Sequence, residues 1–377
     1  MVEGFSLQGD TPVTDRIWRR AARLLASAEI RILLVSLAVH LLVQLPLNLA
    51  MPFPYYSELS EGDAQAYYPI SLDPFPDQPV FSPNKYRRIL LPILVRVVSP
   101  WDHHWGFLIL GVVAASLAAV YFYRIARSLS PHALELTLLF AGVPYLCAGA
   151  HLGYTEPLML AALLAGYDSM SRGQLWLGTV CFALAVLSKE TAVFAVLALL
   201  AVSALGRDWR KAVHMGMALL PPAVYYVALG LHWGDALWLF RGDLHRANVG
   251  FTPWVIFNLL RTARGEPLPL LLVLDQLANM ALLVVLFILV WKLKADRQLF
   301  CFAALTCVPV LFLGPAVVYY NWHVGRQALI ASVSLLGLDR MISTLRPFLW
   351  AVALLMFAVS IYQALFWSKF FWFHKFW

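Results

Sequence analysis

Apolar residues dominate the chain in long runs that short polar connections separate. A helix needs about 20 apolar residues to cross the hydrocarbon core of a bilayer. Several runs reach or approach that length, so the pattern predicts about eleven membrane spans. We expect them at residues 32–49, 105–123, 132–150, 154–170, 174–188, 190–205, 212–231, 269–291, 299–319, 325–339 and 347–367.

Composition supports a membrane protein. The chain is 61% apolar and only 13% charged, whereas soluble domains are about 45–50% apolar and about 25% charged. The net charge of +7 comes from scattered Lys and Arg residues, which argues against a nucleic-acid partner. The four cysteines lie inside apolar runs without CxxC spacing, and no HExxH, Walker or GxGxxG motif is present. We therefore expect no metal and no dinucleotide cofactor.

The predicted fold class is all-α, a polytopic transmembrane helix bundle. Arg16, Arg19, Arg20 and Arg23 alternate with apolar residues, which is typical of a basic helix on a membrane surface. We therefore expect residues 1–31 to form an amphipathic segment on the cytoplasmic face. Residues 32–367 form one transmembrane domain. Residues 368–377 are aromatic and basic, and we expect an interfacial C-terminal tail there.

Positive charges predict the orientation of the bundle. With the N-terminus inside, most basic residues of the short connections fall on the inner side, as the positive-inside rule requires. The two long connections, residues 50–104 and 232–268, then lie outside. In the first, residues 86–96 are too few to span and fit an interfacial helix.

The stretch 175–206 is too long for one span and too short for two complete ones. A hairpin that turns at Ser188-Lys189-Glu190 keeps Arg172 and Arg207 on the same side. Such a turn lies below the outer surface, in protein or in a water-filled cavity, because lipid cannot satisfy its backbone groups.

Polar groups gather at the predicted outer level. Glu61 and Asp63 lie in the first outer connection, where a carboxylate can act as a general base. Ionisable groups interrupt apolar runs at three further places, and such groups point to function. They are His151 and Glu156, Lys189 and Glu190, and His323 and Arg326.

These groups together fit a site that holds a phosphate while a base activates a nucleophile. Arg87, Arg88, Tyr67 and, from the second outer connection, His245 are further candidates. Structural alternatives stay open. Lys189-Glu190 is equally consistent with an internal ion pair, Arg326 with a side chain that reaches the headgroups, and His151 with a helix cap.

The arrangement resembles the GT-C superfamily of integral-membrane glycosyltransferases, and the Tyr154-Thr155-Glu156 step is similar to one in bacterial relatives of the glycosylphosphatidylinositol mannosyltransferases. The residues that carry this resemblance are Gly62-Asp63-Ala64 with Tyr67, Tyr86-Arg87-Arg88-Ile89-Leu90-Leu91-Pro92, Tyr154-Thr155-Glu156-Pro157, Ser188-Lys189-Glu190 and Gly325-Arg326. Members often have Asp-Asp or Trp-Asp where this chain has Glu61-Gly62-Asp63.

The resemblance implies a metal-independent, inverting transfer of a hexose or pentose, such as mannose, from a polyprenyl-phosphate donor to a hydroxyl of a glycan, lipid or protein. It implies that Asp63, or Glu61, is the base. It also implies that Lys189 and Arg326 contact the donor phosphate, with Arg87 or Arg88 as further contacts. The expected location is the bacterial cytoplasmic membrane, with the active site outside.

Three alternatives compete with this interpretation. A secondary transporter or lipid flippase places its polar groups near the midplane, often in repeated halves, and the chain shows no repeat. A membrane acyltransferase needs a histidine-centred pair deeper in the bundle. A non-catalytic subunit with a GT-C scaffold is compatible with the same fold.

Overall fold

The structure is a computed structural model, and its described part is helical, with no strand among the described residues. Three of its helical segments are long and apolar enough to cross a membrane: Ala28–Leu45, His103–Leu129 and Trp209–His232. They suggest membrane association. The structure describes residues 27–50, 63–238, 251–262, 287–296, 298–304 and 330–338, with isolated residues at 277, 280, 281, 284, 285, 351, 354 and 358.

The first half of the described chain contains one short-helix region between two long helices. The long helices are α2 (Ala28–Ala50) and α6 (His103–Leu129). Between them lie α3 (Asp63–Leu72), α4 (Pro83–Arg87) and α5 (Leu90–Val98).

Shorter helices follow α6. They are α7 (Ala133–Ala141), α8 (Pro144–His151), α9 (Glu156–Ser171), α10 (Leu175–Ser188), α11 (Ala192–Leu205), α12 (Trp209–Ala218), α13 (Leu220–His232) and α14 (Thr252–Thr262), with 3-10 turns η1 (Leu293–Ala295) and η2 (Ile330–Leu338).

Prolines divide three segments that the sequence predicts as continuous. The predicted span 132–150 is split into α7 and α8 before Pro144, and the span 212–231 into α12 and α13 before Pro221. The predicted interfacial helix 86–96 is divided into α4 and α5, with Pro92 in the first turn of α5. A proline lacks the N–H of the helical ladder and disfavours the helical conformation of the residue before it.

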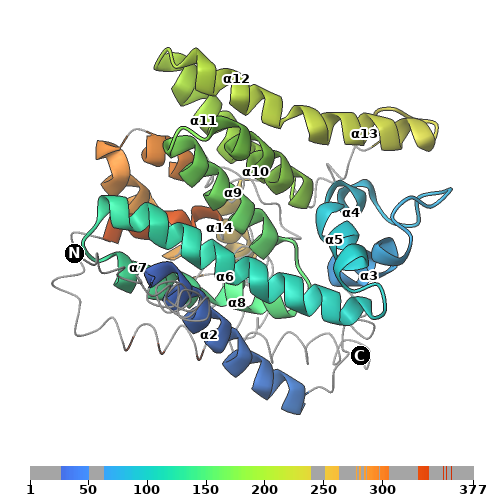
Figure 1. Ribbon diagram of the computed structural model, residues 1–377, viewed down its shortest axis with the longest axis horizontal. Coiled ribbons are helices and arrows are strands. Elements are labelled where there is room, and N and C mark those ends of the chain that lie inside the picture. The colour runs from blue at the N-terminus through green and yellow to red at the C-terminus, as the bar shows by residue number, and fades with distance from the viewer. Residues whose placement is uncertain are drawn as a thin grey trace, which may run out of the picture.

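Helices α9, α10 and α11 lie next to one another in the bundle (Figure 1). Lys189, directly after α10, pairs with Glu156 at the start of α9, so these two helices are antiparallel. Leu199 and Ser203 of α11 line the same small hollow as Tyr167 of α9, so α11 returns toward the end of α9. The chain thus turns between α10 and α11 where the sequence predicts a hairpin. Both helices have 14 residues, about 21 Å each, which is shorter than a full crossing.

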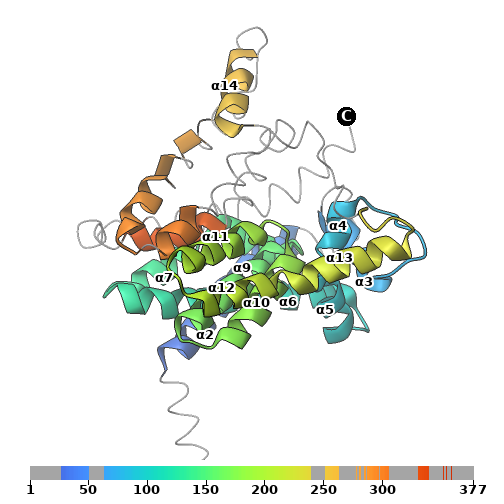
Figure 2. The same ribbon diagram turned by 90° about the horizontal axis from the view of Figure 1, so that it is seen from above.

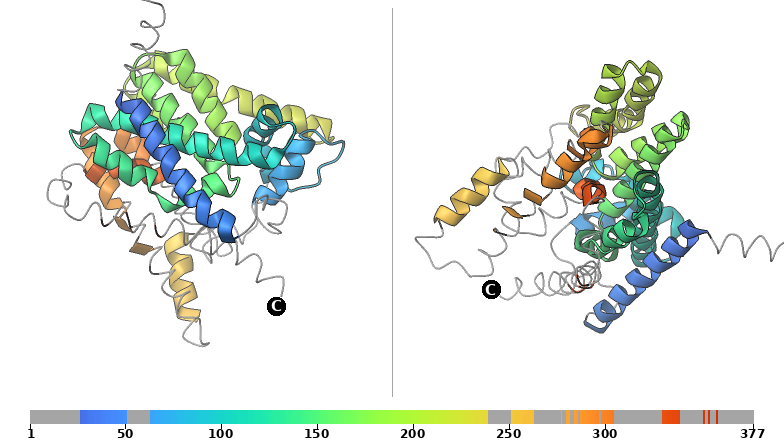
Figure 3. Two further views of the ribbon diagram at one scale, coloured as in Figure 1. Left: turned by 60° about the horizontal axis from the view of Figure 1, so that its bottom comes forward. Right: turned by 90° about the vertical axis from the view of Figure 1, so that its left-hand side faces the viewer.

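The bundle has two polar ends. At one end Asp168 binds Arg124 at 3.1 Å and Arg172 at 2.8 Å. At the same end of α6, Arg127 pairs with Glu29 of α2 at 2.7 Å, and Figure 3 shows α2 crossing α6 on the outside of the bundle. The candidate site described below lies at the other end.

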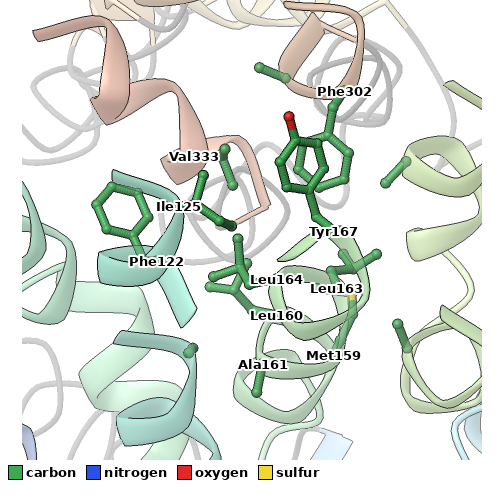
Figure 4. Close-up of a cluster of buried hydrophobic side chains, with 14 of the residues drawn as sticks. Phe122, Ile125, Met159, Leu160, Ala161, Leu163, Leu164, Tyr167, Phe302 and Val333 are labelled. Carbon is green, nitrogen blue, oxygen red and sulfur yellow. The ribbon is translucent and has the colours of Figure 1, made fainter. Parts of the chain in front are cut away.

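The main core lies between α6, α9 and the later segments (Figure 4). Phe122 of α6 stacks on Phe140 of α7 with ring centroids 4.2 Å apart. Tyr167 of α9 packs against Phe302, and Leu160 and Leu164 fill the centre. Large apolar side chains on the outer faces of α2 and α13, such as Leu41 and Val224, are exposed, as expected for helix surfaces that face lipid.

The fold predicts that an added methyl group is tolerated at one helical glycine and not at another. A Cβ at Gly111 would lie 2.2 Å from the Ala150 carbonyl oxygen, whereas a Cβ at Gly149 would meet nothing closer than 3.6 Å. We expect Gly111→Ala to lower the unfolding free energy by about 1–3 kcal/mol through overpacking, measured by thermal unfolding in detergent. Gly149→Ala is the control and should be neutral or stabilising. Equal melting temperatures would contradict this packing.

Candidate functional site

A second, smaller apolar core supports the candidate site. It contains Ala66 and Ile70 of α3, Tyr86 and Ile89 around α4, and Tyr226 and Leu229 of α13. Figure 2 shows α13 reaching from α12 toward α3 and α4. Trp233, directly after α13, donates a hydrogen bond from Nε1 to the Pro76 carbonyl at 2.8 Å. The first long connection is thereby fixed against the end of α13.

A bidentate ion pair joins this smaller core to the main bundle. Arg88 Nε lies 2.9 Å from Glu190 Oε2, and Arg88 Nη2 lies 2.6 Å from Glu190 Oε1. Arg88 is 7% exposed. Two parallel charge-assisted hydrogen bonds fix both distance and orientation. The pair therefore positions the α4–α5 junction on the α10–α11 turn, 102 residues further along the chain.

Tyr67 extends this network into α3. Its hydroxyl accepts a hydrogen bond from Arg88 Nη1 at 3.2 Å, and its side chain is fully buried. Asp63, the predicted base, is the first residue of α3 and lies one turn before Tyr67.

Lys189 forms a separate ion pair deeper in the bundle. Its Nζ lies 2.8 Å from Glu156 Oε1, and both side chains are 1% exposed. Lys189 itself has extended backbone angles as the residue that ends α10, while Glu156 begins α9. A buried cation and carboxylate are tolerated only when paired. The contact expected between Lys189 and a phosphate would therefore compete with Glu156.

Cations surround the Glu190 carboxylate. Arg88 donates two hydrogen bonds to it, and Arg87 and Lys189 interact with it electrostatically. Arg87 lies beside it with a buried Nε, and none of the described residues accepts a hydrogen bond from that atom.

Two tyrosines of α13 complete the site, and the sequence analysis missed both. Tyr225 donates a hydrogen bond to the Tyr86 carbonyl at 2.9 Å, and Tyr226 donates to the Arg87 carbonyl at 3.5 Å. These bonds fix the backbone that presents Arg87. A signal was available, because the two adjacent tyrosines interrupt the apolar pattern of a predicted span.

His151 contacts two residues of α2. Its Nδ1 lies 2.6 Å from Gln44 Oε1, and its Nε2 lies 3.4 Å from His40 Nδ1. His40 and Gln44 are four residues apart on α2, a spacing that places them on one helix face. These contacts join α8 to α2.

Of the predicted site residues, the structure brings together Tyr67, Arg88 and Glu190, with Arg87 beside them, and pairs Glu156 with Lys189. Four others lie outside the described residues: Glu61, His245, His323 and Arg326. No group of three or more His, Cys, Asp or Glu side chains that could hold a metal ion occurs among the described residues. The arrangement offers cations for an anion, in a partly desolvated place where ionic contacts are strong.

Comparison with known proteins finds no protein-family model and no curated protein that matches this sequence.

The Lys189–Glu156 pair predicts a distinctive pattern of stability. Lys189→Met leaves an unpaired buried carboxylate and should lower the unfolding free energy by about 3–5 kcal/mol. Lys189→Met/Glu156→Leu removes both charges and should recover most of that loss. Thermal unfolding of both variants measures the effect, with Lys211→Met as control for a surface pair that is partly exposed. If Lys189→Met is as stable as the parent protein, the pair contributes nothing to stability.

Proposed function

We propose that the protein is a membrane glycosyltransferase of the GT-C type. It moves a sugar from a polyprenyl-phosphate donor to an acceptor hydroxyl with inversion of the anomeric configuration. One observation carries the proposal: the first long connection and the α10–α11 turn contribute Tyr67, Arg88 and Glu190 to one bonded network. Such a network at one end of an apolar bundle suits a substrate whose tail lies in the membrane and whose phosphate lies at headgroup depth.

Arg87 and Arg88 are proposed to hold the donor phosphate. Arg88 already uses two of its nitrogens for Glu190, so its main contribution is a fixed positive charge and the placement of its neighbour. Arg87 is the direct ligand, with its backbone held by Tyr226. Lys189, which stays paired with Glu156, adds positive electrostatic potential from inside the bundle. The sequence pattern adds Arg326 as a further proposed ligand of the phosphate.

Asp63 is proposed to be the base. It removes the proton of the acceptor hydroxyl, the oxygen then attacks the anomeric carbon, and the bond between that carbon and the phosphate oxygen breaks. The polyprenyl phosphate leaves with the bonding electrons, and the positive charge of Arg87 and Arg88 stabilises the negative charge that develops on it. Asp63 lies at the start of α3, one turn from the tyrosine that contacts Arg88.

The proposed location is a bacterial cytoplasmic membrane with the site on its outer face. Arg172, Arg207 and Arg210 lie at the opposite end of the bundle, where the positive-inside rule predicts the cytoplasm.

A transporter or flippase is the second candidate. The observation that favours it is the buried Lys189–Glu156 pair, because paired charges inside apolar helices mark ion and substrate pathways in transporters. Accumulation of a substrate in proteoliposomes, with no sugar transfer to any acceptor, would favour this candidate over the glycosyltransferase.

Loss of the base should abolish turnover without loss of donor binding. In Asp63→Asn we expect at least about a hundredfold lower rate, because general-base catalysis contributes about 10²–10⁴-fold. Transfer from radiolabelled polyprenyl-phosphate sugars measures the rate, and binding of the labelled donor to the same preparation is the internal control. Full activity of Asp63→Asn would remove Asp63 from the mechanism.

Loss of the Arg87 charge should weaken donor binding. We expect Arg87→Gln to raise the dissociation constant for polyprenyl phosphate about tenfold or more, since a hydrogen bond to a charged group contributes about 1.5–3 kcal/mol. Equilibrium binding in nanodiscs measures it. Arg210→Gln, an exposed cation at the opposite end, is the matched control and should bind normally. Equal affinity in the two variants would place the phosphate elsewhere.

A further inference from the structure

Two tryptophans next to the candidate site differ in their surroundings from the other described tryptophans. Trp101, Trp105, Trp176, Trp209, Trp254 and Trp291 are 47–78% exposed, as expected for side chains that contact lipid or its headgroups. Trp233 and Trp238 are only partly exposed. They therefore belong to an ordered surface of the folded protein and do not act only as membrane anchors.

The two rings are held in a fixed arrangement over Tyr86. Trp233 stands edge-on to Tyr86, with centroids 4.8 Å apart and planes at 70°. Trp238 stands edge-on to Trp233, with centroids 4.9 Å apart and planes at 77°. The hydrogen bond from Trp233 to Pro76 locks the first ring further. Rigid rings lose little conformational entropy when a ligand binds them.

Polar residues neighbour these rings along the chain. Asp77 and Gln78 follow directly after Pro76, which bonds Trp233, and both are exposed. Asp235 lies two residues after Trp233 and accepts a hydrogen bond from the Leu237 backbone at 3.0 Å. Aromatic faces beside carboxylate and amide groups suit a sugar, whose C–H bonds form an apolar face and whose hydroxyl groups line its edge.

The rings also lie in the right place for an acceptor. Tyr86, on which they pack, directly precedes Arg87, the proposed phosphate ligand. We infer that Trp233 and Trp238 form a binding surface for a neutral sugar residue of the acceptor, which makes the acceptor a glycan or a glycosylated molecule. This inference rests on the proposed function for the role of the sugar as acceptor, but not for the binding of sugar itself.

Saccharide binding to the full-length protein tests this surface. The protein is placed in phospholipid nanodiscs, because detergents with sugar headgroups would compete. Mannotriose, maltotriose and galactotriose are the probes, and saturation-transfer NMR observes the ligand. We expect at least one trisaccharide to bind the parent protein and Trp238→Ala to weaken that binding at least tenfold. Trp209→Ala, which removes an exposed tryptophan, is the matched control and should leave binding unchanged.

The outcomes separate the two proposals. If none of the trisaccharides binds the parent protein, or if Trp238→Ala binds as well as Trp209→Ala, the sugar surface is overturned. Polyprenyl-phosphate binding is measured on the same variants and should be normal in Trp238→Ala. Saccharide binding without any binding of the polyprenyl phosphate would overturn the proposed function while leaving the sugar surface in place.

Discussion

Pairing of charges that are removed from water governs the arrangement at this end of the bundle. Lys189 and Glu190 are consecutive residues in the turn between two apolar helices. Lys189 is buried and Glu190 is partly buried, and each pairs with a residue of opposite charge. Glu156 supplies one from the start of α9, and Arg88 supplies the other from the junction of α4 and α5. These two pairs fix the three parts of the chain that form the candidate site relative to each other.

The pairs also explain how a short-helix region can be ordered between two long helices. The segment from α3 to α5 has only a small apolar core of its own, which it shares with α13. The bidentate pair between Arg88 and Glu190 joins that core to the bundle. The hydrogen bond from Arg88 to the Tyr67 hydroxyl joins the α4–α5 junction to α3. Rigid placement of the segment follows from a few directional contacts, and a fixed geometry is what a site for an extended, lipid-linked substrate requires.

Much of this arrangement could be predicted because hydrophobicity and charge act locally. Long apolar runs predict helices such as α2 and α6, and the charge interruption at Lys189-Glu190 predicts the turn between α10 and α11. The breaks at α7–α8 and α12–α13 depend on one and two prolines respectively. Hydropathy averaged over a window of residues does not detect so few residues. The partner of each charged side chain could not be predicted from the sequence either. The sequence shows that Lys189 needs a carboxylate and Glu190 a cation, but not which carboxylate or cation of the chain supplies it, because that depends on packing between distant helices. The contact between His151 and Gln44 could not be predicted for the same reason.

The consecutive positions of Lys189 and Glu190 have a consequence for how this protein can vary. Each side chain leaves the turn in a different direction toward a partner of opposite sign. Deletion of one residue before the turn would move Glu190 into the place of Lys189, so that its carboxylate faces Glu156. Insertion of one residue would move Lys189 into the place of Glu190, so that its ammonium group faces Arg88. In either case like charges would meet at one place, and the other partner would lose its counter-charge. Related chains should therefore tolerate exchanges of amino acids around this turn far more readily than changes in its length.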